Sequence, residues 1–154
     1  MQYIQDLFSN QIFLTAATGW LLAQVLKTMI HFILSKEFNA ERLVGDGGMP
    51  SSHSATVSAL ATSVALECGL GGVEFAIAAM FAIVVMHDAM GVRRETGIQA
   101  KLLNEIIQIF EDMGREELSV NDKLKEFVGH TPLQVIMGSL LGIATAFGSY
   151  LIFQ

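Results

Sequence analysis

The sequence predicts an all-α integral membrane bundle with about four spanning helices plus an amphipathic interfacial helix. Hydrophobic residues make up 52% of the 154 residues and charged residues only 16%, compared with about 25% charged residues in soluble domains. The mean hydropathy is +0.50. The length predicts a single domain, residues 1–154. Four long apolar blocks each approach the ~20 residues that a helix needs to cross the hydrocarbon core, and they are residues 11–35, 52–70, 72–92 and 131–153. The alternative is a soluble bundle of buried helices.

The first block, residues 11–35, carries polar side chains on one helical face. Gln24, Lys27 and His31 follow one another at spacings of three and four residues, which places them on the same side of a helix. An ionisable group at such depth is costly and usually faces a polar interior or a substrate. Lys27 is therefore a candidate anion ligand, although a lysine can instead snorkel to the membrane interface.

The segment GGMPSSHS, residues 47–54, has the features of a phosphate cradle ahead of the second block. Its glycines let the backbone come close to a ligand, and Pro50 fits the first position of a helix. The free amides and the positive end of that helix dipole would face an anion. Ser51 and Ser52 add hydroxyl donors, and His53 can give or take a proton near neutral pH.

The third block, residues 72–92, ends beside a cluster of charged residues. Asp88 precedes an arginine pair, Arg93 and Arg94, that two glycines bracket. Guanidinium groups match phosphate oxygens well, so this turn is a second candidate anion site. Its other interpretation is an interfacial anchor.

Residues 95–111 have the pattern of an amphipathic helix. Apolar side chains recur every four residues, and polar side chains fill the positions between them. This pattern suits a helix at the membrane interface or over the end of the bundle. The next residues, 112–128, are rich in acidic side chains, and we expect a solvated loop there.

A second histidine precedes the last block, residues 131–153. Thr131 can cap this helix and Pro132 can occupy its first position, so His130 stands at a helix N-terminus. If all four blocks cross the membrane, His130 lies on the same membrane face as His53, and the two histidines could face one another.

The basic residues outside the apolar blocks fall in two connections, 36–51 and 93–130. If each of the four blocks crosses the membrane once, these two connections lie on the same side of it. The two ends of the chain and the turn at 69–72 lie on the other side and carry no Lys or Arg. The positive-inside rule assigns the basic side to the cytoplasm, although cations that serve to bind an anion would mislead the rule. We therefore expect a multi-pass protein of the cell membrane with its site on the cytoplasmic face.

Two histidines among several cations suggest phosphoryl transfer. A phosphomonoester needs positive charge around its oxygens, an in-line nucleophile and an acid for the leaving alcohol. Two histidines can divide the last two tasks. We expect no metal and no other cofactor, because the histidines are spread and lack an HExxH motif or a nearby carboxylate pair. The single Cys68 excludes an intramolecular disulfide, and the net charge of −6 argues against nucleic acid as a partner.

Two segments resemble motifs of the type 2 phosphatidic acid phosphatase and vanadium-dependent haloperoxidase superfamily. PSSH, residues 50–53, resembles its Pro-Ser-Gly-His motif. HTPLQVIMGSLLG, residues 130–142, resembles its His-x-Pro-x-Asp-Val motif and the Gly-rich helix that follows. GGMPSSHSA, DAMGVRRETGIQAKLLNE and GHTPLQV look closer still to the divergent membrane subfamily of bacterial and plant proteins. The likeness covers most of residues 24–145.

The resemblance implies a covalent mechanism in which His130 forms a phosphohistidine and His53 protonates the leaving group. The candidate phosphate ligands are Lys27, Arg42, Gly48, Ser51, Ser52, Arg93 and Arg94. Lys36 competes with Lys27 for the place of the first-motif lysine.

Gln134 occupies the position of the acid that would orient the nucleophilic histidine. A glutamine can fix the histidine tautomer by accepting a hydrogen bond from one ring nitrogen. It cannot stabilise an imidazolium as a carboxylate does. Asp88 is the nearby carboxylate that could substitute.

The sequence therefore predicts a membrane phosphatase that hydrolyses a lipid or prenyl phosphate, whose tail lies between helices while its head enters the basic pocket. The expected partners are this phosphate-bearing substrate and membrane lipids, and a homodimer could complete the pocket. One alternative is a non-catalytic phosphate- or anion-binding membrane protein, which Gln134 favours. Another is an anion transporter or channel subunit, which Lys27 at depth favours.

Overall fold

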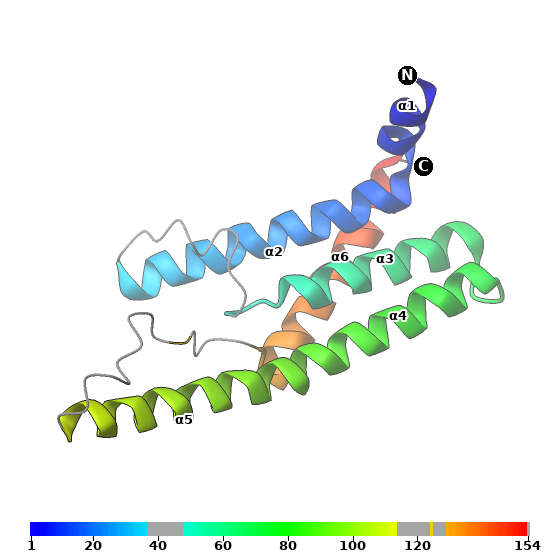
Figure 1. Ribbon diagram of the computed structural model, residues 1–154. Coiled ribbons are helices and arrows are strands. Elements are labelled where there is room, and N and C mark those ends of the chain that lie inside the picture. The colour runs from blue at the N-terminus through cyan, green and yellow to red at the C-terminus, as the bar shows by residue number, and fades with distance from the viewer. Residues whose placement is uncertain (37–47, 114–123, 125–128, 154) are drawn as a thin grey trace.

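The computed structural model describes residues 1–36, 48–113, 124 and 129–153, whose regular secondary structure is entirely helical. The helices are α1 (Gln2–Ser9), α2 (Gln11–Ser35), α3 (Ser52–Cys68), α4 (Val73–Met90), α5 (Val92–Asp112) and α6 (Pro132–Phe153). α3 packs against α2, α4 and α6, while α1 turns away from the bundle (Figure 1). This architecture confirms the helical membrane bundle that the sequence predicts.

Three stretches of the described chain are long and apolar enough to cross a membrane, namely Gln11–Ser35, Val73–Phe110 and Pro132–Phe153. The second expected block, residues 52–70, forms α3, which has only 17 residues and is therefore about 25 Å long. Its contacts with α2, α4 and α6 enclose much of its surface in protein. Its serine- and alanine-rich sequence suits this place, because small side chains let neighbouring helices approach closely.

Glycines on α6 and α2 let these helices pack directly on the backbone of α3. A Cβ atom at Gly142 would collide with the carbonyl oxygen of Ala55, and one at Gly138 would collide with that of Ser51. From α2, a Cβ atom at Gly19 would lie 3.2 Å from the same Ala55 oxygen. The four-residue spacing of the α6 glycines is the small-xxx-small pattern of closely packed membrane helices.

The helix ends gather as the alternation of the apolar blocks predicts. At one end, the amide of Ser51 donates to the carbonyl oxygen of Gln134 in α6 at 3.0 Å. At the same end, the amide of His130 donates to the carbonyl oxygen of Ala89 in α4 at 2.9 Å. Both chain termini lie at the other end (Figure 1). The candidate residues that precede α3 and α6 are therefore neighbours.

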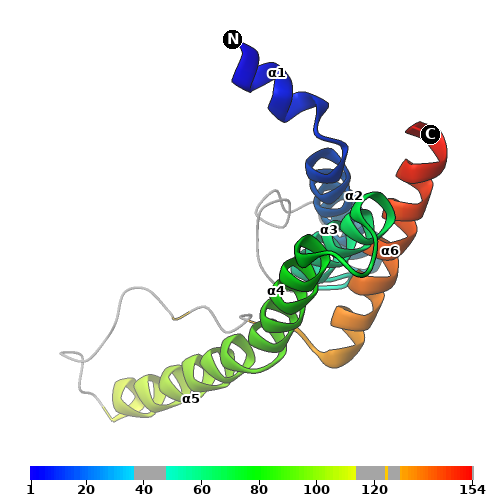
Figure 2. The same cartoon turned by 90° about the vertical axis from the view of Figure 1, so that its right-hand side faces the viewer.

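α5 begins directly after α4 and leaves the bundle (Figure 2). It contains the predicted amphipathic segment, 95–111. One of its faces exposes apolar side chains, including Ile98 and Leu102. On another face, the side chain of Asn104 exchanges two hydrogen bonds with the backbone of Leu124, at 2.9 and 3.0 Å. Most of the predicted acidic loop lies outside the described residues.

Replacing Gly142 by leucine is expected to destabilise the bundle, because the new side chain would have to displace the backbone of α3. Overpacking of this kind costs ~1–3 kcal/mol or more. Thermal unfolding of the detergent-solubilised protein should show a lower midpoint for Gly142→Leu. The matched control is Gly148→Leu on the same helix, where a Cβ atom would meet nothing within 4 Å. Equal midpoints for the two variants would contradict the close contact.

Candidate functional site

The two histidines that the sequence pairs lie side by side at the basic end of the bundle. The ring centroids of His53 and His130 are 5.8 Å apart, and the rings meet edge to face at 64°. His130 is only 2% exposed, and His53 is half-buried. The two rings therefore lie next to each other at one place, as the predicted division of tasks requires.

Ser51 holds the start of α3. Its hydroxyl oxygen accepts hydrogen bonds from the amide of Ser54 at 3.3 Å and from the hydroxyl of Ser54 at 3.0 Å. Ser51 is thus the N-cap and α3 begins at Ser52, so the prediction that Pro50 is the first helical residue is wrong. A serine hydroxyl can satisfy an amide of the first turn, which proline cannot do. The positive end of the α3 dipole still lies at this helix start, beside His53, the second helical residue.

Gln134 fixes both the start of α6 and the ring of His130. Its side-chain Oε1 accepts a hydrogen bond from the backbone amide of Thr131 at 3.0 Å, and its backbone amide donates to the Thr131 hydroxyl at 3.4 Å. This reciprocal pair is a capping box, and α6 begins at Pro132 as predicted.

The same Oε1 of Gln134 lies 3.2 Å from Nδ1 of His130. The side-chain atom of Gln134 that accepts a hydrogen bond from the backbone N–H of Thr131 must be the oxygen, because the side-chain nitrogen of glutamine only donates. In a neutral ring that contacts this oxygen, Nδ1 therefore carries the proton and Nε2 carries the lone pair. Gln134 thus performs the orienting part of the role that the resemblance assigns to an acid.

Gly129 packs His130 against the junction of α4 and α5. Its φ is +103°, a conformation that favours glycine. A Cβ atom here would collide with the backbone of Arg94. The turn before α6 therefore lies directly on the start of α5, which brings the arginine pair to the same end of the bundle as the two histidines.

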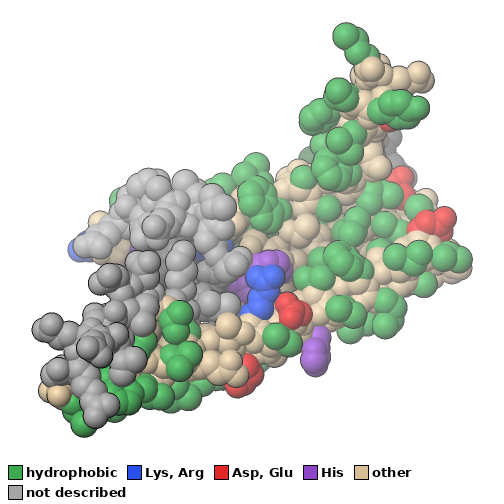
Figure 3. Space-filling model, viewed as in Figure 1, with side chains coloured by type: hydrophobic (Ala, Val, Ile, Leu, Met, Phe, Trp, Pro, Cys, Tyr) green, Lys and Arg blue, Asp and Glu red, His purple; other side chains and the backbone are tan. Residues whose placement is uncertain are grey.

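Arg93 and Asp88 form an ion pair at this junction. The guanidinium Nε of Arg93 donates to Oδ2 of Asp88 at 3.1 Å, and both side chains are partly exposed. The carboxylate that could substitute for the missing acid therefore lies against an arginine, while His130 contacts Gln134. Basic, acidic and histidine side chains meet near the middle of the face shown in Figure 3.

Lys27 lies buried beneath the segment that leads into α3. It is 2% exposed, and a Cβ atom at Gly48 would lie 3.0 Å from its Cδ. Gly48 has a φ of +89°, so glycine suits both the conformation and the close approach. Lys36, the rival candidate, is exposed at the C-cap of α2. This placement favours Lys27, and Arg42 lies outside the described residues.

Two further polar side chains are buried near this end of α2 and α3. Ser52 is 4% exposed in the first turn of α3, and Gln24 is 5% exposed in α2. The Oε1 atom of Gln24 has no hydrogen-bond partner among the residues that the structure describes. Because a buried acceptor without a partner is costly, Gln24 is a candidate contact for a substrate group. The spacing of Gln24 and Lys27 in the sequence predicts that they share one face of the helix, but it does not predict that Gln24 is buried.

Comparison with known proteins gives one family and one curated relative. The sequence profile of a family described as "Divergent PAP2 family" matches residues 8–145. The chain is similar to a protein of Bacillus subtilis (strain 168) named "Uncharacterized membrane protein YuiD", with 42% identity over 146 residues. That alignment covers 90% of this chain and 92% of the relative. No solved structure matches the chain.

The contact between His130 and Gln134 predicts a tautomer that ¹⁵N NMR can measure. At a pH where the ring is neutral, we expect His130 to be protonated at Nδ1 and unprotonated at Nε2. Gln134→Ala removes the fixed acceptor, so the His130 signals should move toward a mixture of tautomers. The exposed His87 on α4 provides a control whose signals should not move. Protonation of His130 at Nε2 in the unmodified protein would contradict this role of Gln134.

Proposed function

Because this chain belongs to the divergent PAP2 family, we propose that it is a membrane phosphatase that hydrolyses a lipid or prenyl phosphate through a phosphohistidine intermediate. The observation that carries the proposal is the pair of His53 and His130, whose centroids are 5.8 Å apart. The contact of Gln134 with Nδ1 of His130 supports the assignment of roles within the pair. It makes His130 the ring that presents a nucleophilic Nε2.

In the first step, Nε2 of His130 attacks the phosphorus atom of the bound phosphomonoester. A nitrogen–phosphorus bond forms as the bond from phosphorus to the leaving oxygen breaks. His53, as imidazolium, gives its proton to that oxygen, so the product leaves as a neutral alcohol. Gln134 keeps the Nδ1 proton of His130 in place while positive charge develops on the ring.

In the second step, water attacks the phosphohistidine on phosphorus. His53, now neutral, takes a proton from the water, and the nitrogen–phosphorus bond breaks. Inorganic phosphate leaves, and both histidines return to their starting protonation states. An amide stabilises the charged form of His130 less than a carboxylate would, so we expect a slower enzyme than relatives with an acid at this position.

Phosphate binding is proposed for the groups around the start of α3. The positive end of the α3 dipole attracts an anion, and Ser52 lies in the first turn. Gly48 lets the backbone approach, while Lys27, Arg93 and Arg94 supply positive charge. Arg42, which lies outside the described residues, is proposed as a further phosphate ligand from the sequence alone. The Ser51 hydroxyl caps the helix, so its contribution to phosphate binding is to hold the first turn in position.

An apolar groove between α2 and α3 supports a substrate with a hydrocarbon tail. Its lining includes Phe13, Ala16, Ala17 and Trp20 from α2 and Thr56 and Leu60 from α3, around a volume of about 510 Å³. Leu60 follows His53 by seven residues, or two helical turns, so both lie on the same face of α3. A lipid or prenyl chain in this groove would place its phosphate near His53.

The proposed site lies at the end of the bundle that carries the basic loops. The positive-inside rule then places it on the cytoplasmic face of the cell membrane. A substrate embedded in that leaflet could enter from the side, with its tail remaining in the membrane. This arrangement fits a lipid phosphate better than a soluble phosphate ester.

The central test is phosphate release by the purified protein from a panel of lipid and prenyl phosphates. His130→Ala should abolish release because it removes the nucleophile. His53→Ala should lower release by roughly 10²–10⁴-fold, the usual contribution of a general acid. His87→Ala is the matched control and should leave release unchanged, because His87 is exposed on α4.

The same variants distinguish a folding defect from a chemical one. With p-nitrophenyl phosphate, whose leaving group needs no proton, His53→Ala should still form an acid-labile phosphoprotein, while His130→Ala should form none. Phosphate binding without release by the unmodified protein would instead support the non-catalytic anion-binding alternative. Release that survives His130→Ala would exclude the phosphohistidine route.

The groove can be tested separately from the chemistry. Ala17→Trp should fill part of it without unfolding the protein, because Ala17 is exposed. We expect kcat/KM for long-chain lipid phosphates to fall by about tenfold or more, while that for p-nitrophenyl phosphate stays unchanged. Ala144→Trp is the matched control, since Ala144 is exposed on α6 and does not line the groove. Equal effects on long and short substrates would contradict tail binding in this groove.

A further inference from the structure

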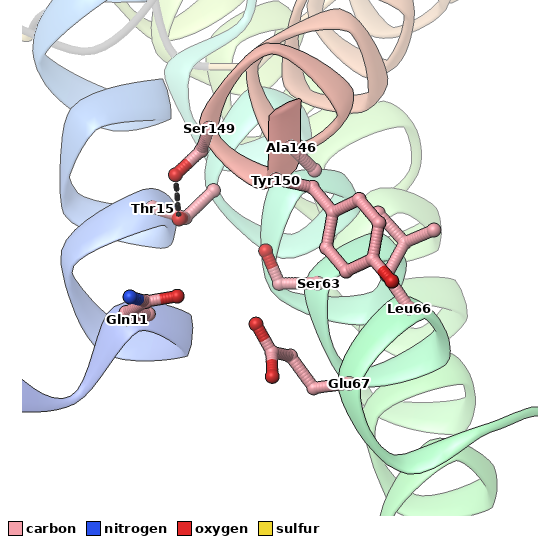
Figure 4. Close-up of a pocket in the computed structure, with 8 residues that line it drawn as sticks. All are labelled: Gln11, Thr15, Ser63, Leu66, Glu67, Ala146, Ser149 and Tyr150. Carbon is pink, nitrogen blue, oxygen red and sulfur yellow. Dashed lines mark hydrogen bonds between the residues drawn. The ribbon is translucent and has the colours of Figure 1, made fainter. Parts of the chain in front are cut away.

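A second polar pocket lies at the opposite end of the bundle, where both termini are found. Figure 4 shows oxygen-bearing side chains from α2, α3 and α6 around one space. They are Gln11, Thr15, Ser63, Glu67, Ser149 and Tyr150, and the cavity between them has a volume of about 10 Å³, roughly the room of one water-sized sphere. The proposed phosphatase chemistry uses none of these residues.

The hydroxyl groups of this pocket are held inside the bundle. Thr15 is 4% exposed and Ser63 is 6% exposed. The hydroxyls of Thr15 and Ser149 lie 2.7 Å apart, which joins α2 to α6. Since a hydroxyl oxygen has two lone pairs, both oxygens can still accept a cation after this hydrogen bond forms. Three helices therefore present a preformed set of oxygen donors.

The charged side chains at this end of the bundle favour a cation. Glu67, an exposed side chain at the mouth of the pocket, is the acidic residue in the lining, and no salt bridge joins it to another described side chain. The sequence has no Lys or Arg in residues 1–26, 43–92 or 126–154. The negative dipole ends of α3 and α6 flank the pocket, together with the positive dipole end of α2, which begins at Gln11.

The donor set selects among cations. All the polar donors are hard oxygens, which do not suit soft transition metals. Ca²⁺ and Mg²⁺ sites usually contain more carboxylates, and the described residues contain no group of three or more His, Cys, Asp or Glu placed to hold a metal ion. One negative charge with several neutral oxygens matches a single positive charge.

We propose that this pocket binds a monovalent alkali cation, sodium or potassium, between α2, α3 and α6. The carboxylate of Glu67 supplies the compensating charge, and the hydroxyl and amide oxygens of its neighbours supply neutral ligands. The ion joins the three helices at the end of the bundle opposite the histidine pair. It therefore stabilises the folded protein without taking part in phosphoryl transfer.

Thermal unfolding of the detergent-solubilised full chain tests this proposal. The melting midpoint is measured at one ionic strength in sodium chloride, potassium chloride and N-methyl-D-glucamine chloride. One or both alkali salts should raise the midpoint by roughly 8 °C over the organic cation when the alkali ion concentration exceeds the dissociation constant of the site about 100-fold. The comparison of the two salts identifies the preferred ion.

Glu67→Gln should remove the difference between the salts, because Glu67 carries the one charge among the described residues that line the pocket. Glu74→Gln is the matched control, since Glu74 lies in the first turn of α4 at the same end but outside the pocket. If Glu67→Gln fails to fold, Ser63→Ala provides a milder variant and ²³Na NMR of the unmodified protein provides a direct measurement of binding.

Equal midpoints in the three salts would overturn the proposal, as would a salt effect that survives Glu67→Gln. A rise that only Ca²⁺ or Mg²⁺ produces would also overturn it. None of these measurements uses phosphate release, so their outcome is independent of the proposed phosphatase activity.

Discussion

The contact between the glycines of α6 and the backbone of α3 is the constraint on which the rest of the structure depends. Gly138 packs on the carbonyl oxygen of Ser51, and Gly142 packs on that of Ala55. The first turns of the two helices therefore meet with little side-chain volume between them, and the amide of Ser51 reaches the backbone of Gln134. The two histidines are attached to these first turns, so their 5.8 Å separation follows from small residues along the seam.

Gln134 meets a structural and a chemical requirement with one side chain. Its oxygen completes the capping box of α6 and also contacts Nδ1 of His130. A carboxylate could make both contacts and would stabilise an imidazolium better. It would also place a negative charge next to the position proposed for a phosphate dianion, where like charges repel. The side-chain amide of Gln134 fixes the His130 tautomer without that repulsion. The proposed site would therefore hold a phosphate more tightly but hydrolyse its ester more slowly.

Sequence patterns predicted the helices, and they predicted the end of the bundle at which the candidate residues meet, because hydropathy and crossing parity act over whole segments. They predicted the cap of α6 at Thr131 and the contact of Gln134 with His130, but other local pairings differ from the prediction. Pro50 precedes the helix that Ser51 caps, and Asp88 lies against Arg93. Each outcome depends on which group tertiary packing brings within hydrogen-bond distance, and spacing along the chain does not determine that. The burial of Gln24 likewise arises only when α2 packs on α3.

The charge distribution along the bundle relates its two ends. α3 directs the positive end of its dipole toward the histidine pair and the negative end toward the pocket of Glu67. An anion at the first end and a cation at the second would both align favourably with this one helix. Polar side chains within a membrane bundle are costly unless they are paired with protein or ligand, and Lys27 and Thr15 are buried at opposite ends. Opposite ligand charges at the two ends would compensate both groups of polar residues, whereas two ligands of the same charge would set one of them against the dipole of α3.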